Sequence, residues 1–249
     1  LFGEVPEGKD KSLASFRSHL DAFRSHRETE AADTISARDE ALIEMNTQMA
    51  EDNIVKAMQA AVKAQTLSNN LDDIMFLEDV QAVLSKTQLA IDDHTSEGNL
   101  LTAQTLLYYL RTFYEGTSRR DLFERWNDRL EAVALQVSLL RQYAPEHLHA
   151  LFVERAEVLG DDPPEEFNAQ ASDNWIVRVD GIDKSMVVRS LDIAISEHIA
   201  DVSWEELIKG GLDAVNALGN VPVISETFEH VSDSRARYDW AEAIQDEYA

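Results

Sequence analysis

The stretch SRRDLFERWNDRLEAVALQVSLL, residues 118–140, carries the most regular hydrophobic pattern in the chain. Its apolar side chains recur at intervals of three and four residues, at Phe123, Trp126, Leu130, Val133, Val137 and Leu140. This spacing places them on one face of an α-helix. Ser118, with Asp121 three residues later, is a variant of the capping box that opens helices. We therefore predict a long amphipathic helix, suited to the centre of a helical bundle.

Helical spacing also marks most of the chain around this stretch. Apolar residues at such intervals predict further helices, a first one from Ser12 and others near 33–67, 74–91, 99–114 and 145–160. Ser68–Asn70, the polar run 92–99 and Gly116 are the expected breaks. Pro145 suits a first helical turn and Gly160 a helix end.

The first helix contains a short repeat. The tetrad Phe-Arg-Ser-His occupies residues 16–19 and again 23–26, so both phenylalanines share a face with Leu13 and Leu20. Two heptads are too few to define a coiled coil. His19 and His26 also share a face, which would suit a pH-sensitive seam or a metal clip between chains. We favour the plainer interpretation of two exposed histidines that flank an apolar stripe.

Composition changes after residue 160. Two prolines, a glycine and four acidic residues between Gly160 and Glu166 predict a break between domains. We predict a mainly α fold with these parts: a flexible lead at 1–11, a bundle of about six helices at 12–160, an acidic linker at 161–172 and a smaller α(+β) domain at 173–249. In the last part we expect one or two short strands, Trp175–Val179 and Val221–Ile224, beside helices near 187–198, 203–219 and 234–248.

The chain is strongly acidic, with 47 acidic against 22 basic residues and a formal net charge of −25. Residues 161–249 contain 20 acidic and 6 basic residues, so they carry more than half of the net charge. This charge disfavours nucleic acid and anionic membranes as direct partners. It favours a basic protein partner, a high-salt environment or an assembly kept soluble by self-repulsion. We interpret the densest basic group as helix-surface ion pairs, at Arg119, Arg120, Arg125 and Arg129.

The sequence lacks the common motifs for nucleophilic catalysis, nucleotide binding and metal binding. There is no cysteine, no nucleotide-binding glycine motif and no Gly-x-Ser-x-Gly. The densest group of metal-ligand types is His147 and His149 with Glu154, but the two histidines lie two positions apart, so on a helix they point away from each other. The run that starts at Asp93 departs from a calcium loop at its twelfth position, Gln104. We therefore predict no catalytic, cofactor-binding or metal residues and no cofactor.

Several large side chains suit either a core or a partner surface. One set is methionines at near-helical spacing, and another is aromatic residues that cover more than one face of a helix. We interpret the methionines and tryptophans chiefly as core residues, while some of the aromatic residues on one helix must meet another element. The three sets are Met45, Met49, Met58 and Met75; Tyr108, Tyr109, Phe113 and Tyr114; and Trp175, Trp204 and Trp240.

These patterns favour a non-enzymatic structural or assembly protein, such as a component of a virion or of a multi-subunit machine, which acts as a homo-oligomer or in a larger assembly. Two alternatives stay open: an acidic adaptor for a basic protein, and a helical enzyme subunit with a site around His147, His149 and Glu154. We expect a soluble chain, cytoplasmic or virion-associated, with no membrane contact, signal peptide or transmembrane segment. The start at Leu1 suits a processed or trimmed chain.

Overall fold

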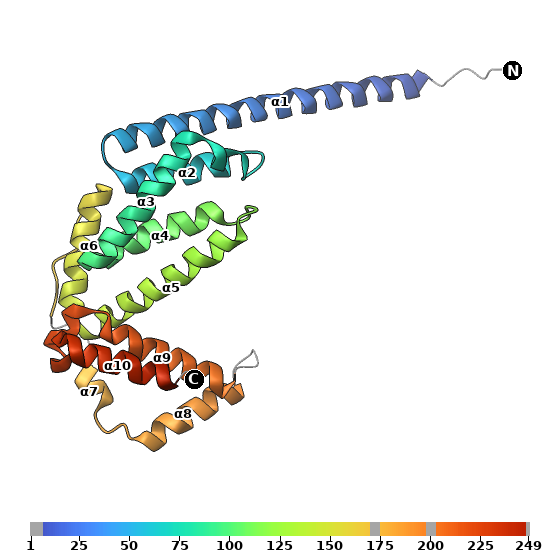
Figure 1. Ribbon diagram of the computed structural model, residues 1–249. Helices are drawn as coiled ribbons and strands as arrows, with labels where there is room; N and C mark the ends of the chain where they lie inside the picture. The colour runs from blue at the N-terminus through green and yellow to red at the C-terminus, as the bar shows by residue number, and fades with distance from the viewer. Residues whose placement is uncertain (1–6, 170–174, 198–202, 248–249) are drawn as a thin grey trace. The chain divides into compact units, whose positions relative to one another are not determined.

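The fold is built from helices joined by short turns (Figure 1). We analysed a computed structural model, which describes residues 7–169, 175–197 and 203–247. These residues contain helices, turns and irregular segments, and no strand. The mainly α fold class is therefore confirmed. Backbone contacts divide the chain into two units, one of residues 1–86 and 112–120, the other of residues 87–111 and 121–249. The predicted domain boundaries stay a prediction.

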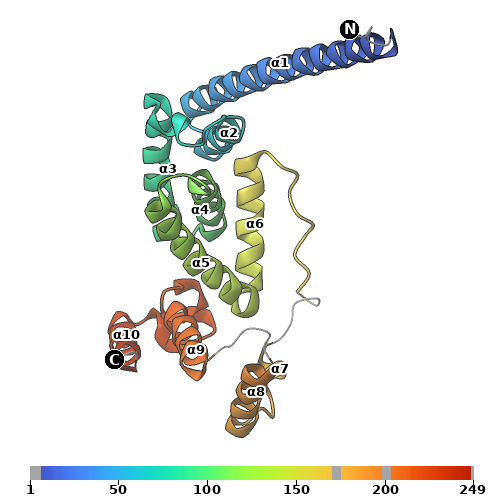
Figure 2. The ribbon, with the colours of Figure 1, turned by 90° about the vertical axis from the view of Figure 1, so that its right-hand side faces the viewer.

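The first unit contains the longest helix, α1 (Glu7–Ala50), followed by α2 (Ile54–Thr66), the short η1 (Asp73–Phe76) and the first half of α3 (Glu78–Glu97). Figures 1 and 2 show α2 beside the C-terminal part of α1 only. Apolar side chains form the core of this unit, among them Ala41, Met45, Val55, Met58, Ile74, Val80, Leu84 and Phe113. The buried amide of Gln65 donates a hydrogen bond to the carbonyl oxygen of Phe113.

The second unit contains the end of α3, most of α4 (Leu100–Tyr114), α5 (Arg120–Tyr143) and α6 (Pro145–Leu159). The stripe on α5 faces the core, with Trp126, Val133, Val137 and Leu140 buried. Pro145 begins α6 and Gly160, at φ 70°, ends it, as the sequence predicts. Residues 161–168 then follow without regular structure.

The C-terminal helices also belong to the second unit. They are α7 (Trp175–Val179), α8 (Lys184–Glu197), α9 (Trp204–Gly219), η2 (Pro222–Glu226), η3 (Glu229–Ser232) and α10 (Ser234–Glu247). The predicted capping box of α9 is present: Ser203 Oγ accepts from the Glu206 amide, and the Glu206 carboxylate accepts from the Ser203 amide. Helix α9 runs through Gly210 and Gly211, and a Cβ added at either would meet nothing within 4 Å.

Both predicted strands are wrong. Trp175–Val179 forms the single-turn helix α7, and Pro222–Glu226 forms the 3-10 helix η2. A strand needs a neighbour to accept its backbone hydrogen bonds, and the described residues supply none. A helical turn satisfies these groups locally instead, as in the 3.1 Å bond from the Asp180 amide to the Ile176 carbonyl oxygen.

Three predicted helix boundaries in the N-terminal half are also wrong. Helix α1 starts at Glu7, before the predicted start at Ser12 and within the predicted lead at 1–11, while residues 1–6 lie outside the described part. No helix begins at 33, because α1 continues unbroken to Ala50. The break comes instead at Asp52, whose φ of 64° is left-handed. The predicted turn at 92–99 is mostly helix, because α3 continues to Glu97.

Among the described residues, no helix has both the length and the apolar composition that a membrane span requires.

Candidate interaction surface

The surface of α1 changes character along its length. Ala41 and Met45, near its C-terminal end, are buried. Every residue from Ala14 to Ser36 is exposed. We call residues 14–36 the arm. A helix in water gains most of its stability from packing an apolar face, and the arm has no such packing against the described residues.

The arm exposes large apolar side chains on one face. Phe16 is 65% exposed, Phe23 is 59% exposed, and Leu20 lies between them at 36%. Intervals of four and three residues place these three together, and Arg17, Arg24 and Arg27 fall within the same third of the helix circumference. We call these six residues the arm face. Burying each of the three apolar side chains would contribute about 2 kcal/mol.

The arm face continues the face that packs in the C-terminal part of α1. Phe23 and Ala41 are 18 residues apart, which is about five full turns of an α-helix. Phe16 and Met45 are 29 residues apart, close to eight turns. Ala41 and Met45 are buried, whereas the two phenylalanines are exposed. One stripe of α1 is therefore covered in its C-terminal part and uncovered in its N-terminal part.

The charge of this segment differs from that of the chain. Between Lys9 and Arg27 there are five lysines and arginines against two aspartates, a surplus of three positive charges in a chain of net charge −25. A search for dense basic clusters does not reveal this surplus, because these residues are spread over five turns. A charge sum over short windows would have found it.

Polar contacts on the arm are local to the helix. Thr29 and Thr34 each donate to the carbonyl oxygen four residues earlier, at 3.0 and 2.8 Å. Arg24 lies 3.9 Å from Asp21 in an exposed ion pair. The Nδ1 atom of His19 lies 2.8 Å from the Ser15 carbonyl oxygen, and Nε2 of His26 lies 3.3 Å from Glu30. Both histidines are exposed beside the apolar stripe, as the favoured interpretation expects.

A second exposed apolar feature lies at the end of the chain. The C-terminal part of α9, η3 and the first half of α10 surround an open cavity of about 570 Å³. Its walls are mostly apolar, with Leu218, Phe228 and Trp240 among them, and Asp239 also lines it. The Trp240 indole donates to the Val215 carbonyl oxygen at 3.1 Å. The buried Nε of Arg237, another lining residue, has no hydrogen-bond partner among the described residues.

Helices α7 and α8 bury none of their side chains. Asp183 caps α8, because its carboxylate accepts from Ser185 Oγ at 2.6 Å and from the amides of Ser185 and Met186. These bonds hold the pKa of Asp183 below its ordinary value. Trp175, at the start of α7, meets Tyr143 edge-on, with ring centroids 5.3 Å apart.

The candidate metal ligands do not come together. His149 lies 2.6 Å from the carbonyl oxygen of Glu165 and stacks near Phe167, while His147 lines a different hollow beside Gly98. Among the described residues, no group of three or more histidine or acidic side chains could hold a metal ion. The run from Asp93 lies largely inside α3, which does not provide the loop that calcium coordination requires.

The arginine group on α5 engages aromatic rings as well as carboxylates. Arg129 pairs with Asp92 at 2.7 Å, and its guanidinium lies 5.4 Å from the ring centre of Trp126. Arg125 lies 5.1 Å from the same ring. The Asp92 carboxylate comes from α3 rather than from the same helix, so this ion pair joins two elements. This arrangement uses the arginine side chains in packing.

The methionine and aromatic sets divide between core and surface. Met45, Met58 and Met75 are buried, which confirms their interpretation as core residues. Phe113 and Tyr114 are buried, whereas Tyr108 is exposed and lines a shallow hollow with Tyr109. Burial raises the pKa of the Tyr109 hydroxyl, with smaller contributions from Tyr108 and Asp161. Trp204 is 40% exposed and Trp240 is 45% exposed, so their interpretation as core residues is wrong.

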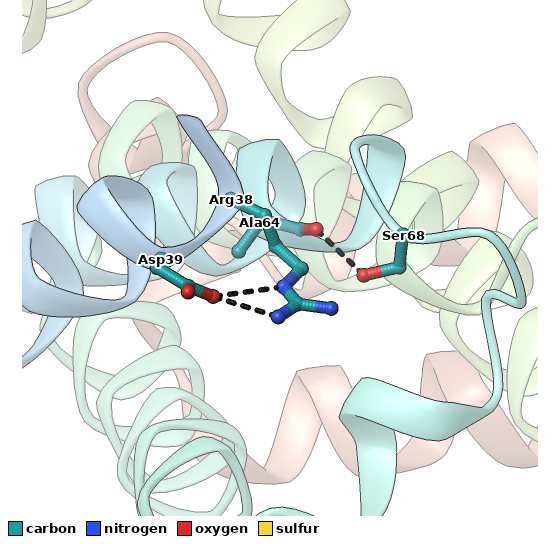
Figure 3. Close-up of polar contacts among 4 residues, drawn as sticks. All are labelled: Arg38, Asp39, Ala64 and Ser68. Atoms are coloured by element: carbon teal, nitrogen blue, oxygen red, sulfur yellow. Dashed lines mark hydrogen bonds and ion pairs between the residues drawn. The ribbon is translucent and has the colours of Figure 1, made fainter. Parts of the chain in front are cut away.

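A smaller hollow of about 340 Å³ lies between α1, α2 and η1. Figure 3 shows two of its lining residues: Nε and Nη2 of Arg38 donate to Asp39 at 3.0 and 2.7 Å, and Ser68 Oγ donates to the Ala64 carbonyl oxygen at 2.9 Å. Both polar groups have partners from their own helix or its end. This arrangement is typical of a helix junction.

No protein-family model, no curated protein and no solved structure matches this chain. The functional argument therefore depends on the surfaces described above.

Proposed function

We propose that this chain is a non-enzymatic assembly protein that acts through protein–protein contacts and associates with itself. The observation that carries the proposal is the arm face, where Phe16, Leu20 and Phe23 are exposed and do not pack against the part of the chain that the structure describes. Aromatic residues and arginine are the types that most often supply binding energy at protein interfaces. The arm face consists almost entirely of these types.

The open cavity at α9 and α10 supports the same proposal. It gathers Leu218, Phe228 and Trp240 around a volume large enough to accept side chains from a partner. Contiguous exposed apolar surface of this kind commonly marks a site of association. Proteins that build virions or multi-subunit machines associate as many copies through surfaces of this kind, and we propose the role by analogy with them.

The test is the mass of the purified chain in solution. We expect sedimentation velocity to show a mass that rises with concentration from about 1 µM to 500 µM, since a single modest interface gives affinities in this range. The double variant Phe16→Gln/Phe23→Gln should shift the association to at least about tenfold higher concentration, because it removes both aromatic anchors.

The matched control is Ser18→Gln/Ser25→Gln, which introduces the same residue at the same spacing on the opposite side of the arm. The control should associate as the wild type does. A wild-type chain that stays monomeric at every concentration, at both low and high salt, would overturn the proposal. If both double variants changed the association equally, the arm face would not be the surface through which the chain associates.

A further inference from the structure

A short segment of α1 and the C-terminal part of the chain carry opposite charge. The segment from Lys9 to Arg27 has a surplus of three positive charges, while residues 161–249 hold 20 acidic and 6 basic residues. Opposite charges attract surfaces toward each other and select the partner, even where they add little to affinity. The arm face, with its three arginines, therefore has an acidic counterpart in every copy of this chain.

The acidic residues of α10 form a stripe that matches the arm in spacing. Asp239, Glu242 and Asp246 are all exposed and recur at intervals of three and four residues, so they share one face of the helix. Arg235, one turn earlier, reduces the net charge of that face to two negative charges. Asp239 and Asp246 are separated by seven residues, a rise of about 10.5 Å, as are Arg17 and Arg24 on the arm.

The acidic stripe borders the apolar cavity. Asp239 belongs to the stripe and also lines the cavity, beside Trp240. On the arm face, arginines likewise alternate with Phe16 and Phe23. The acidic stripe and the arm face thus carry charges of opposite sign beside apolar side chains, and the cavity wall itself holds both Asp239 and Arg237. A cavity of about 570 Å³ accepts aromatic anchors of this size.

We propose that the arm face of one copy docks on the cavity and acidic stripe of α9 and α10 in a second copy. This inference rests on the proposed function and names the partner. The aromatic anchors fill the cavity, and the arginines pair with Asp239, Glu242 and Asp246. Because the two contacting surfaces differ, each copy keeps one arm and one cavity available, and association proceeds head to tail.

The test reverses charge on each surface separately. The arm reversal is Arg17→Glu/Arg24→Glu/Arg27→Glu, and the stripe reversal is Asp239→Lys/Glu242→Lys/Asp246→Lys. Each reversal alone places like charges opposite one another, and we expect self-association at low salt to weaken by at least about tenfold in sedimentation velocity. Both reversals in one chain restore opposite signs, and we expect association within about threefold of the wild type.

A matched control separates local pairing from total charge. Asp161→Lys/Asp162→Lys/Glu166→Lys changes the net charge as much as the stripe reversal does, outside α10, and should alter association by less than about threefold. Circular dichroism of every variant verifies that its helix content matches the wild type. High salt, near 1 M, should weaken wild-type association because it screens the pairs beyond about 3 Å.

The outcomes distinguish this inference from the proposed function. Association that depends on Phe16 and Phe23 but not on the stripe would overturn the inference and leave the proposed function in place, as expected for direct pairing of two arms. A failed rescue by the combined reversals would also overturn the inference. If the wild type is monomeric and its arm is protected from hydrogen exchange, the arm packs against its own chain. That result would overturn both the inference and the proposed function.

Discussion

Helix α5 and the arm of α1 carry the same kind of sequence pattern but differ in the burial of their apolar residues. Both have apolar residues at intervals of three and four, but Trp126 and Val137 on α5 are buried, while Phe16 and Phe23 on the arm are exposed. Hydrophobic periodicity therefore identifies which face of a helix is apolar. It does not identify what covers that face, and on the arm none of the described residues does so.

The largest expected effect on stability is the difference between a Phe→Ala substitution in the core and the same substitution on the arm. Phe113→Ala should lower the free energy of unfolding by about 3–5 kcal/mol, because Phe113 is fully buried and its truncation leaves a cavity. Phe16→Ala should change it by less than about 0.5 kcal/mol. Urea denaturation, followed by circular dichroism at a concentration where the chain is monomeric, measures both. Equal losses would show that the arm packs within its own chain.

An intermediate effect is expected at the capping box of α9. Ser203→Ala should destabilise the start of this helix by about 1 kcal/mol, because it removes the acceptor of the Glu206 amide. Hydrogen exchange of the first turn of α9 should speed up. Glu205→Ala is the control, since that side chain lies in the same turn and takes no part in the capping box. A larger effect of Glu205→Ala would contradict the role assigned to Ser203.

The same box makes α9 sensitive to acid. Hydrogen bonds from the Ser203 amide and hydroxyl lower the pKa of Glu206 below its ordinary 4.5. A lowered pKa means that the ionised form stabilises the fold. The contribution is therefore present above pH 4.5 and is lost as pH falls through the lowered value. In the Ser203→Ala variant, exchange in α9 should vary less with pH below 4.5.

The smallest effect is expected at the turn between α1 and α2. Asp52 has a left-handed backbone, so Asp52→Gly and Asp52→Asn should preserve stability better than Asp52→Ala. Its exposed carboxylate accepts from Lys86, which lowers its pKa, so this pair stabilises the turn above pH 3.8 and loses its effect below that. The midpoint of thermal unfolding should rank the three variants. Lys86→Met should remove the pH dependence that belongs to this pair, and an unchanged profile would contradict the pairing.

Helix ends that depend on a few neighbouring residues could be predicted from the sequence. Pro145 and Gly160 bound α6 because each residue restricts or permits one backbone conformation, whatever surrounds it. The capping box at Ser203 was equally predictable. The predicted start at residue 33 failed because a polar stretch interrupts the apolar pattern without interrupting the helix, and no glycine or proline stands there to end it.

Features that depend on distant partners were not predictable in this way. Trp175–Val179 has strand-forming residues, but a strand also needs a neighbour, and the local sequence does not encode one. The Arg129–Asp92 pair joins α5 to α3 across 37 positions, so no spacing rule on one helix indicates it. The exposure of the arm face is of the same kind, because only the fold reveals that none of the residues in 7–169, 175–197 and 203–247 covers it.

The uninterrupted course of α1 has a mechanical consequence. Forty-four helical residues rise about 66 Å, and Phe16 stands about 37 Å along that axis from Ala41, where packing against the core begins. This length leaves Phe16 accessible, clear of α2, to a body as wide as a small domain. A rod of this kind also resists compression along its axis, which a flexible tether of equal length cannot do. The length of α1 thereby sets how far from the core of its unit a surface docked on the arm face would stand.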